Sequence, residues 1–336
     1  MGERICIVNA GGWGTALAVL LGSKGYEVRL WARRRDLAEE IATSRENPSY
    51  LPGVRLPDNI WPTADLEWAV SGATVVVVAA ISRFIKDLAP MLGPLLKPDQ
   101  LVISGSKGLD EASLMRATEQ LEAWAGSTHR GRIAALSGPN HAEEVSRGIP
   151  TATVVACRDE AVAKQLQQIL ATGSFRVYTN PDIVGVELCG TVKNVVAIAA
   201  GMSDGLGYGD NAKAALLTRS LAEIGRLVVS MGGRASTVAG LAGIGDIIAT
   251  CTSKHSRNRA AGEAVARGST VEQVRSRSPM EVEGFPATRS IHKLARLKGV
   301  EMPITEQVYA ILFEGLSPQK GLAQLMTRDC TSEPWM

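Results

Sequence analysis

Short apolar runs recur through the first 180 residues, with helical spacing between most of them. Residues 74–80, TVVVVAA, are apolar and β-branched, as is typical of a parallel strand covered on both faces. Leu101–Ser104, Ile133–Leu136, Thr151–Ala156 and Ser174–Tyr178 predict further strands. The alternation of strands and helices predicts a doubly wound α/β sheet.

The chain begins with a compact strand–helix–strand pattern. Arg4–Asn9 predicts a buried strand, Gly14–Lys24 a helix capped at Gly25, and Glu27–Ala32 a second strand. This βαβ unit of about thirty residues is the context that a dinucleotide-binding turn requires.

Near residue 180 the pattern becomes helical, and no strand is expected from Asn180 onward. The polar stretch Val271–Met280 predicts a surface loop or a frayed helix. The expected helices are Val184–Ala200, Asn211–Met231, Asn258–Arg267, Ala287–Lys298 and Thr305–Glu314. We therefore expect a Rossmann-like dinucleotide-binding domain over residues 1–182 and an all-helical domain over residues 183–336.

Composition narrows the class of protein. A chain of 336 residues is long for one core, so two domains are expected. The net charge of +2 argues against nucleic acid or an anionic membrane as partner. The apolar runs are too short for an integral membrane segment.

The cysteines exclude two kinds of site. They form no C-x-x-C pair, so neither a zinc ribbon nor a redox motif is expected, and no metal site is predicted. Four of the five have apolar or small-residue surroundings, which indicate buried reduced thiols and a cytoplasmic location. The five are Cys6, Cys157, Cys189, Cys251 and Cys330.

The stretch VNAGGWGTALA, residues 8–18, is a variant of the G-x-G-x-x-G turn. Asn9 stands at the first position, while Gly11 and Gly14 keep the other two. Asparagine tolerates the positive φ that the turn demands. The stretch is compatible with pyrophosphate binding and also with an ordinary strand-to-helix turn.

Arginines follow the second strand, in WARRRD. An NAD-selective site places an acid there for the ribose 2′-hydroxyl, whereas Arg33 and Arg34 suit the 2′-phosphate of NADP. A solvated run of charge at a strand end is the other interpretation.

Two stretches carry polar groups in unusual surroundings. In TVKNVVAIAAGM, Lys193 is either a proton-transfer group whose pKa falls in apolar surroundings or a lysine reaching out to solvent. In GLAGIGDIIATCTSKHSRNR, Asp246 predicts a helix cap. Ser256, Arg257 and Asn258 then predict either an anion site at a helix start or capping beside a surface arginine.

Two loops follow predicted strands. SGSKGLD carries Lys107, and LSGPNHAEEV carries Gly138 and Asn140. Ligands bind beyond the carboxyl ends of strands in such sheets, so these residues are expected to face the same crevice as the glycine turn. Plain βα turns are the alternative.

Taken together, these stretches resemble the bacterial NAD(P)-dependent glycerol-3-phosphate dehydrogenases over nearly the whole chain. The resemblance rests on WGTALA, SKGL, SGPNHAEEV, VGVELCGTVKNVVAIAAGMSDGLG, GLAGIGD, TCTSKHSRNR, EVEG and EMPITE, which occur in that order.

The resemblance implies reduction of dihydroxyacetone phosphate to sn-glycerol 3-phosphate with NADP or NAD as cofactor, feeding phospholipid synthesis. It makes Lys193 the proton donor or acceptor. It implies substrate contacts for Lys107, Gly138, Asn140, Lys193, Asp246, Ser256, Arg257 and Asn258. It implies cofactor contacts for Gly11, Gly12, Trp13, Gly14, Arg33, Arg34, Lys107, Ala142, Arg257, Glu281 and Glu283.

Some residues depart from the family's pattern. Asn9 replaces a glycine, Ile81 and Arg83 stand where proline and histidine or glutamine are usual, and Glu281 replaces a small apolar residue. Two other functions remain open, a β-hydroxy-acid dehydrogenase of similar plan and an NAD(P)-binding regulatory protein without turnover. The helical domain could also offer a homodimer face.

Overall fold

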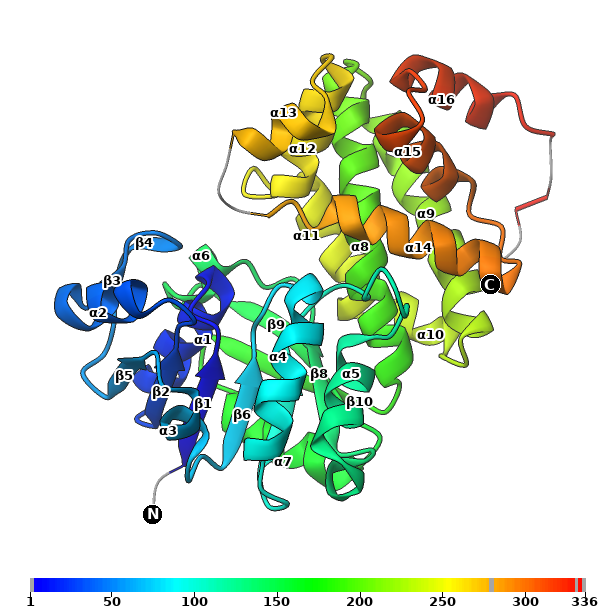
Figure 1. The fold of residues 1–336 in the computed structure, drawn as a ribbon. Helices are drawn as coiled ribbons and strands as arrows, with labels where there is room; N and C mark the ends of the chain where they lie inside the picture. The colour runs from blue at the N-terminus through cyan, green and yellow to red at the C-terminus, as the bar shows by residue number, and fades with distance from the viewer. Residues whose placement is uncertain (1–2, 278–280, 330–331, 334–336) are drawn as a thin grey trace. The chain divides into compact units, whose positions relative to one another are not determined.

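The computed structural model describes residues 3–277, 281–329 and 332–333. Its internal contacts divide the chain into two compact units (Figure 1). The sheet unit comprises residues 1–106 and 117–183, and the helical unit comprises residues 107–116 and 184–336. The short segment Lys107–Arg116 thus packs with the helices, although it lies in the chain between strands of the sheet.

An eight-stranded sheet, in the order β10-β9-β8-β7-β6-β1-β2-β5, organises the sheet unit. Its strands are β1 (Arg4–Val8), β2 (Glu27–Trp31), β5 (Ile60–Thr63), β6 (Val75–Val78), β7 (Leu101–Ser104), β8 (Ile133–Ser137), β9 (Thr151–Ala156) and β10 (Phe175–Asn180). The predicted strands are confirmed. The structure adds β5 and a small hairpin of β3 (Glu46–Asn47) and β4 (Leu51–Arg55), whose short, partly exposed strands give a weak apolar signal.

Successive strand residues contact opposite faces of the sheet. Ile5 and Ile7 of β1 pack with one core, whereas Cys6 and Val8 pack with the other. One core is covered by α1 (Gly12–Ser23), α2 (Arg35–Ser44) and α7 (Glu160–Leu170), and the other by α3 (Leu66–Val70), α4 (Ile85–Leu92) and α5 (Ala117–Ala125). This confirms a doubly wound, Rossmann-like sheet.

The sheet is not parallel throughout. β9 runs antiparallel to β8, and β10 runs parallel to β9. The carboxyl ends of β9 and β10 therefore lie on the opposite side of the sheet from the carboxyl ends of the strands that run the other way. These other strands include β1, β2, β6, β7 and β8. The buried apolar sequence of β9 is equally compatible with either direction.

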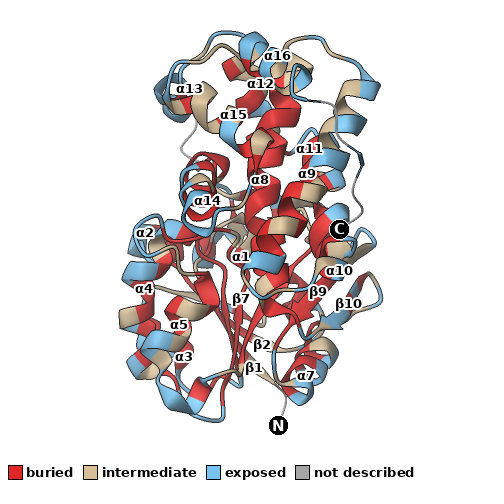
Figure 2. Ribbon diagram, turned by 90° about the vertical axis from the view of Figure 1, so that its right-hand side faces the viewer, coloured by how far each residue is buried: buried red, intermediate tan, exposed pale blue. Residues whose placement is uncertain are grey.

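The helical unit is built around α8 (Ile183–Gly205), whose residues are almost all buried (Figure 2). Among the described residues after Asn180 there is no strand, as predicted. Around α8 lie α9 (Asp210–Ser230), α10 (Ala235–Val238), α11 (Asp246–Thr252), α12 (Arg257–Ala266), α13 (Val271–Ser276), α14 (Gly284–Lys298), α15 (Pro303–Phe313) and α16 (Pro318–Met326).

Three of these helices differ from the sequence expectation, and one of them is the four-residue α10, which was not expected. Thr270 forms a capping box with Gln273, so the start of the polar stretch Val271–Met280 is a defined helix. Residues 278–280, the end of that stretch, lie outside the described residues. Helix α16, which begins at Pro318 after a Ser317 cap, was not expected at all.

Helices α8 and α12 cross in close contact. A Cβ on Gly262 would stand 2.0 Å from the carbonyl oxygen of Ile198, and one on Gly201 would stand 1.9 Å from that of Arg259. Only glycine fits these positions. The two glycines therefore bring the backbones together and place Asn258 beside Asn194.

Among the residues that the structure describes, two helical stretches have the length and hydropathy of a membrane span. One is α8, and 94% of its most apolar window is buried inside the protein. The other, Ala235–Thr252, is 44% buried and is divided between α10, a π-helical turn and α11. Burial identifies α8 as the core helix of the unit.

Candidate active site

The glycine turn has the backbone conformation predicted for it. Asn9 adopts φ = +88°, and its Nδ2 donates a hydrogen bond of 3.1 Å to the carbonyl of Ala79 at the end of β6. A Cβ on Gly14 would lie 2.1 Å from the Asn9 oxygen. Asparagine thus adopts the positive φ of the first glycine, and its amide bonds the turn to a neighbouring strand.

The start of α1 has the features of an anion site. No side chain caps Gly11, and the first turn holds no acidic residue. A Cβ on Gly12 would stand 2.8 Å from the Tyr50 oxygen and 4.0 Å from the Ala142 Cβ. The buried Nε1 of Trp13 has no hydrogen-bond partner among the described residues. Uncapped N–H groups beside a close-packed glycine backbone fit a dinucleotide pyrophosphate.

Arg33 and Arg34, which are both exposed, follow β2. The Arg33 guanidinium lies 5.2 Å from the centre of the Phe84 ring. Arg34 precedes α2, and its Nε lies 3.7 Å from the Asp36 carboxylate. Both side chains of this pair are more than half exposed, so the contact contributes little to stability.

The loop after β8 is fixed by its contacts with β9. Gly138 has φ = +147°, and a Cβ there would press on the Thr153 backbone. The Asn140 Nδ2 donates to the Thr153 hydroxyl at 3.2 Å, which donates in turn to the Ser137 carbonyl. The residues implied for substrate binding in this loop are thus held in one conformation.

A lysine–aspartate–lysine cluster lies inside the helical unit. The Nζ of Lys193, on α8, donates to Asp246 Oδ1 at 2.6 Å and to the Thr250 hydroxyl at 2.9 Å. The Nζ of Lys107 donates to the other oxygen, Oδ2, at 2.8 Å. Asp246 has a 2% exposed side chain, and those of the lysines are 10% and 13% exposed. One buried carboxylate therefore serves two ammonium groups, leaving an excess positive charge suited to an anion.

Local structure explains how these three groups meet. A π-helical turn, Leu241–Gly245, precedes Asp246, and a Cβ on Gly243 would stand 2.0 Å from the Val238 oxygen. The segment carrying Lys107 is anchored by a buried ion pair of 2.6 Å between Arg116 and Glu187 of α8. Such π turns recur at functional sites, where they redirect a side chain.

Burial and charge act against each other in this cluster. Burial lowers the pKa of Lys107 to about 8, although the Asp246 carboxylate opposes the shift. Burial alone would raise the pKa of Asp246, but the charges and hydrogen bonds of Lys107 and Lys193 hold it below its ordinary value. Burial raises the pKa of Glu283, against the charges of Arg257 and the two lysines. Asp246 is thus the ionised counter-charge of the cluster.

The structure corrects the expected role of Asp246 as a helix cap. Asp246 is the first residue of α11, Gly245 holds the cap position, and no side chain caps this helix. The carboxylate accepts from lysine Nζ atoms instead, because the preceding π turn directs it toward α8. Lys107 likewise belongs with the helical unit and not with the sheet whose strand precedes it.

Two asparagines connect three helices beside the cluster. Asn194 Nδ2 donates to the Lys107 carbonyl at 3.3 Å, and Asn258 Nδ2 donates to Asn194 Oδ1 at 2.8 Å. The N–H of Gly284 donates to Asn258 Oδ1 at 2.9 Å. The buried amide of Asn258 therefore positions α8, α12 and α14 relative to one another.

Ser256 and Arg257 open α12. The Ser256 hydroxyl accepts from the Arg259 N–H, so it is a helix cap, as one of the two interpretations predicts. Arg257 Nη1 donates to the Glu281 carbonyl at 3.0 Å. Glu281 thus holds the arginine through its backbone, and Glu283 precedes α14.

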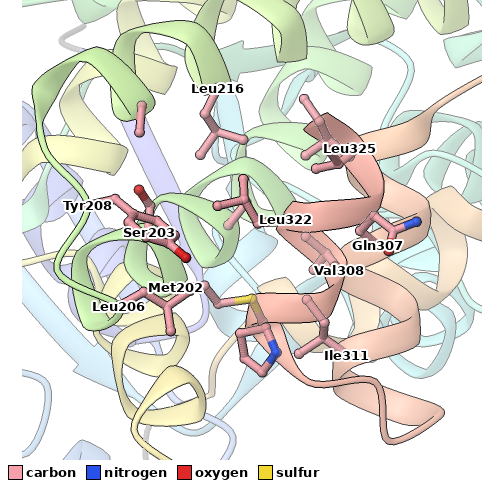
Figure 3. A pocket seen from close by; sticks show the side chains of 15 residues that line it. Met202, Ser203, Leu206, Tyr208, Leu216, Gln307, Val308, Ile311, Leu322 and Leu325 are labelled. Atoms are coloured by element: carbon pink, nitrogen blue, oxygen red, sulfur yellow. The ribbon is translucent and has the colours of Figure 1, made fainter. Parts of the chain in front are cut away.

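Sequence reasoning missed Thr250, whose hydroxyl also donates to Asp246 Oδ1 at 3.2 Å. Its position one helical turn after Asp246 is the signal that could have identified it. A separate pocket lies between α8, α9, α15 and α16, where Met202, Leu216 and Leu322 face one another (Figure 3). None of the described residues that line it is charged, so it offers no counter-charge to a phosphate.

A dinucleotide-type glycine turn and a buried lysine–carboxylate cluster are features of a nicotinamide-dependent dehydrogenase. Comparison with known proteins defines the family. The models of the N-terminus and C-terminus of NAD-dependent glycerol-3-phosphate dehydrogenase match residues 4–163 and 182–323. The chain belongs to this family.

Individual relatives match this chain over nearly its full length. Glycerol-3-phosphate dehydrogenase [NAD(P)+] of Moorella thermoacetica is 48% identical over 333 residues, covering 99% of this chain and 98% of its own. The enzyme of that name from Chlorobium limicola is 48% identical over 331 residues, covering 98% and 99%. The crystal structure of glycerol-3-phosphate dehydrogenase from Coxiella burnetii has a TM-score of 0.92 at 39% identity, covering 97% and 99%.

Proposed function

We propose that this protein reduces dihydroxyacetone phosphate to sn-glycerol 3-phosphate with NADPH or NADH, and so feeds glycerophospholipid synthesis. The observation that supports this proposal is the cluster of Lys193, Asp246 and Lys107. The full-length relatives of the chain are named glycerol-3-phosphate dehydrogenase [NAD(P)+]. These relatives favour this reaction over a β-hydroxy-acid dehydrogenase or a regulatory protein without turnover.

The sheet unit contributes cofactor binding. The N–H groups at Gly11–Gly14 bind the pyrophosphate, with Trp13 and Ala142 beside them, and Arg33 and Arg34 meet the adenosine ribose. When bound, the reduced cofactor supplies the hydride that reaches the carbonyl carbon. Arginines at this position favour use of NADPH at least as readily as NADH.

Lys193 acts as the proton donor in ketone reduction. Two of its three N–H bonds point to Asp246 and Thr250 in the described structure, and the third donates to the carbonyl oxygen of the substrate. As the oxygen gains negative charge, the ammonium stabilises it and then transfers a proton, leaving a neutral amine. Asp246 orients the ammonium, and Lys107 adds a second positive charge.

Arg257 anchors the substrate phosphate at the start of α12, next to Ser256 and Asn258. The helix has ten residues and no acid in its first turn, so its N-terminus favours an anion. Gly138 and Asn140 contact the substrate from their loop, while Glu281 and Glu283 contact the cofactor beside Arg257. Anchoring the phosphate holds the carbonyl in line with Lys193.

Two further assignments belong to this proposal. The described cysteines, Cys6, Cys157, Cys189 and Cys251, are all buried free thiols, which supports a reducing, cytoplasmic location. The helical unit is proposed to form a homodimer. Equilibrium sedimentation of the purified chain tests the dimer, and a single monomeric species would refute it.

The reaction is tested by cofactor oxidation with four candidate substrates: dihydroxyacetone phosphate, dihydroxyacetone, and two β-keto acids. We expect efficient turnover of the phosphorylated ketone alone. We expect Lys193→Ala to remain folded and to lose about 10²–10⁴-fold in kcat, the range for a general acid. Preferred turnover of a β-keto acid, or near-normal kcat in folded Lys193→Ala, would contradict the proposal.

A further inference from the structure

We propose that Arg83 is a further specificity-determining residue, which together with Arg33 binds the 2′-phosphate of NADPH, while Phe84 holds both guanidinium groups in place. This inference rests on the proposed use of NADPH and adds a residue from a second strand end to the arginines after β2.

The topology brings the two arginines to one edge of the sheet. Arg33 follows β2 and Arg83 follows β6, and both strands pair in parallel with β1, which lies between them (Figure 1). Their carboxyl ends therefore lie on either side of the glycine turn that follows β1. Residues far apart in the sequence thus meet around one segment, where the adenosine half of a dinucleotide is bound in such sheets.

One aromatic ring contacts both side chains. The Arg83 guanidinium carbon lies 4.6 Å from the centre of the Phe84 ring, and that of Arg33 lies 5.2 Å from the same centre. A guanidinium stacks on an aromatic ring through its face and keeps its N–H edge for other partners. Phe84, which is partly buried, therefore restricts both arginines without consuming their hydrogen-bond donors.

The charges at this edge are matched to a dianion. Arg33 and Arg83 are both exposed, and two like charges on one ring repel each other. A phosphate between them would relieve the repulsion and accept charge-assisted hydrogen bonds from two directions. The uncharged 2′-hydroxyl of NADH offers neither benefit. The pair therefore discriminates between the cofactors by charge.

Arg34 is less suited to this task than its neighbour. Its Nε already lies near the Asp36 carboxylate, at 3.7 Å, so part of its charge is offset locally. The N-terminus of α2, which Arg34 precedes, carries no side-chain cap and adds N–H groups on the same side. Arg33 is therefore expected to contribute more to phosphate recognition than Arg34.

The experiment measures binding and not turnover. Calorimetric titration of the full-length protein would use adenosine 2′,5′-bisphosphate and adenosine 5′-monophosphate, which lack nicotinamide, and then NADPH and NADH. We expect Arg83→Gln to weaken the two 2′-phosphorylated ligands about ten-fold or more, as for a lost charge-assisted hydrogen bond. The two ligands without that phosphate should change less than about two-fold.

Two further variants make the result specific. Arg83→Lys keeps the charge but loses the planar fork, so it should recover part of the affinity. Arg158→Gln removes an exposed arginine after β9, at the opposite edge of the sheet, and should change none of the four dissociation constants.

Each contrary result has its own meaning. If the wild-type protein binds the bisphosphate no better than the monophosphate, the chain has no 2′-phosphate site, and both the proposed NADPH use and this inference fail. If the wild type discriminates and Arg83→Gln discriminates equally well, only the role of Arg83 is wrong. Equal weakening of all four ligands would show that Arg83 contacts the adenosine or stabilises the fold, and that it does not recognise the 2′-phosphate.

Discussion

At the scale of single residues, function here depends on side chains whose partners are distant in the sequence. Lys193 could be singled out because it interrupts an apolar helix. The sharing of Asp246 between Lys193 and Lys107 could not, because residues 117–183 of the sheet unit separate the two lysines in sequence. Thr250 was missed because a threonine in a short helix is ordinary until its neighbours are known.

Asn9 allows a first prediction, because its backbone strain and its hydrogen bond offset each other. Asn9→Gly removes the bond to Ala79, worth about 1 kcal/mol, and also relieves a positive φ of similar cost. We expect an unfolding free energy and an NADPH dissociation constant close to those of the wild type.

The matched control for Asn9 is alanine. Asn9→Ala loses the bond and keeps the unfavourable φ, so its unfolding free energy should fall by about 1–2 kcal/mol. Urea unfolding measures both variants. Loss of NADPH binding in Asn9→Gly would show that the asparagine amide is itself a cofactor ligand.

Lys107 allows a prediction about pH. Because burial lowers the pKa of Lys107 to about 8, its ammonium is charged below that pH and neutral above it. Attraction for an anionic substrate should therefore weaken as pH rises from about 7 to 9, and kcat/KM for dihydroxyacetone phosphate should fall. The sign is opposite for stability, since the unfolded chain binds more protons in this range and folding gains as pH rises.

The control replaces the titrating group. Arg stays charged throughout this range, so Lys107→Arg should abolish the alkaline fall in kcat/KM even if its activity is lower at every pH. Initial rates across the range, with cofactor saturating, measure both profiles. An unchanged alkaline limb in Lys107→Arg would assign it to another group.

At the scale of elements, the apolar pattern determines which segments are strands and helices but not how they are arranged. β9 was predicted correctly, yet its reversal relative to β8 has no signature, because a buried apolar strand suits either direction. The hairpin β3–β4 was not predicted, for another reason. Its strands are short, partly polar and packed by neighbours, so their local pattern is weak.

The crossing of α8 and α12 gives the prediction at this scale. A Cβ at Gly262 would stand 2.0 Å from the Ile198 oxygen, and neither backbone can yield easily. Gly262→Ala should lower the unfolding free energy by about 1–3 kcal/mol or more, as overpacking does. It should also lower kcat, because Asn258 lies one turn away on the same helix.

A glycine with open space is the matched control. Nothing lies within 4 Å of the position that a Cβ on Gly173 would take, so Gly173→Ala should change stability by less than about 1 kcal/mol. Chemical denaturation and steady-state rates compare the two alanine variants. Equal effects at the two positions would show that the contact between α8 and α12 is not what requires glycine.

At the scale of the whole molecule, the chain distributes its tasks between two units. The sequence predicts both from the change of pattern near residue 180, and a doubly wound sheet and a helical domain are found. It does not show that Lys107–Arg116 leaves the sheet unit and packs with the helices. The buried pair of Arg116 and Glu187 joins this segment to α8, and no local pattern reveals such a contact between distant residues.

This division predicts that a variant in one unit loses the stabilising effect of one ligand on thermal unfolding, and that a variant in the other unit loses the effect of the other ligand. A ligand at about 100 times its dissociation constant stabilises the folded state by about 2.7 kcal/mol. NADPH should stabilise Asp246→Asn nearly as it does the wild type, while sn-glycerol 3-phosphate should lose its effect on this variant. In Arg33→Ala the NADPH effect should shrink and the glycerol 3-phosphate effect should persist.

Tryptophan fluorescence and far-UV circular dichroism together provide the measurement. Five of the six tryptophans lie in the sequence of the sheet unit, so fluorescence follows that unit, and Trp335→Phe removes the sixth. The dichroism signal follows the helices, most of which belong to the helical unit. Each shift is taken from the variant's own unliganded midpoint, which corrects for any loss of stability. If Asp246→Asn lost both ligand effects while still folded, the carboxylate would serve cofactor binding as well, and its assignment to the substrate alone would be wrong.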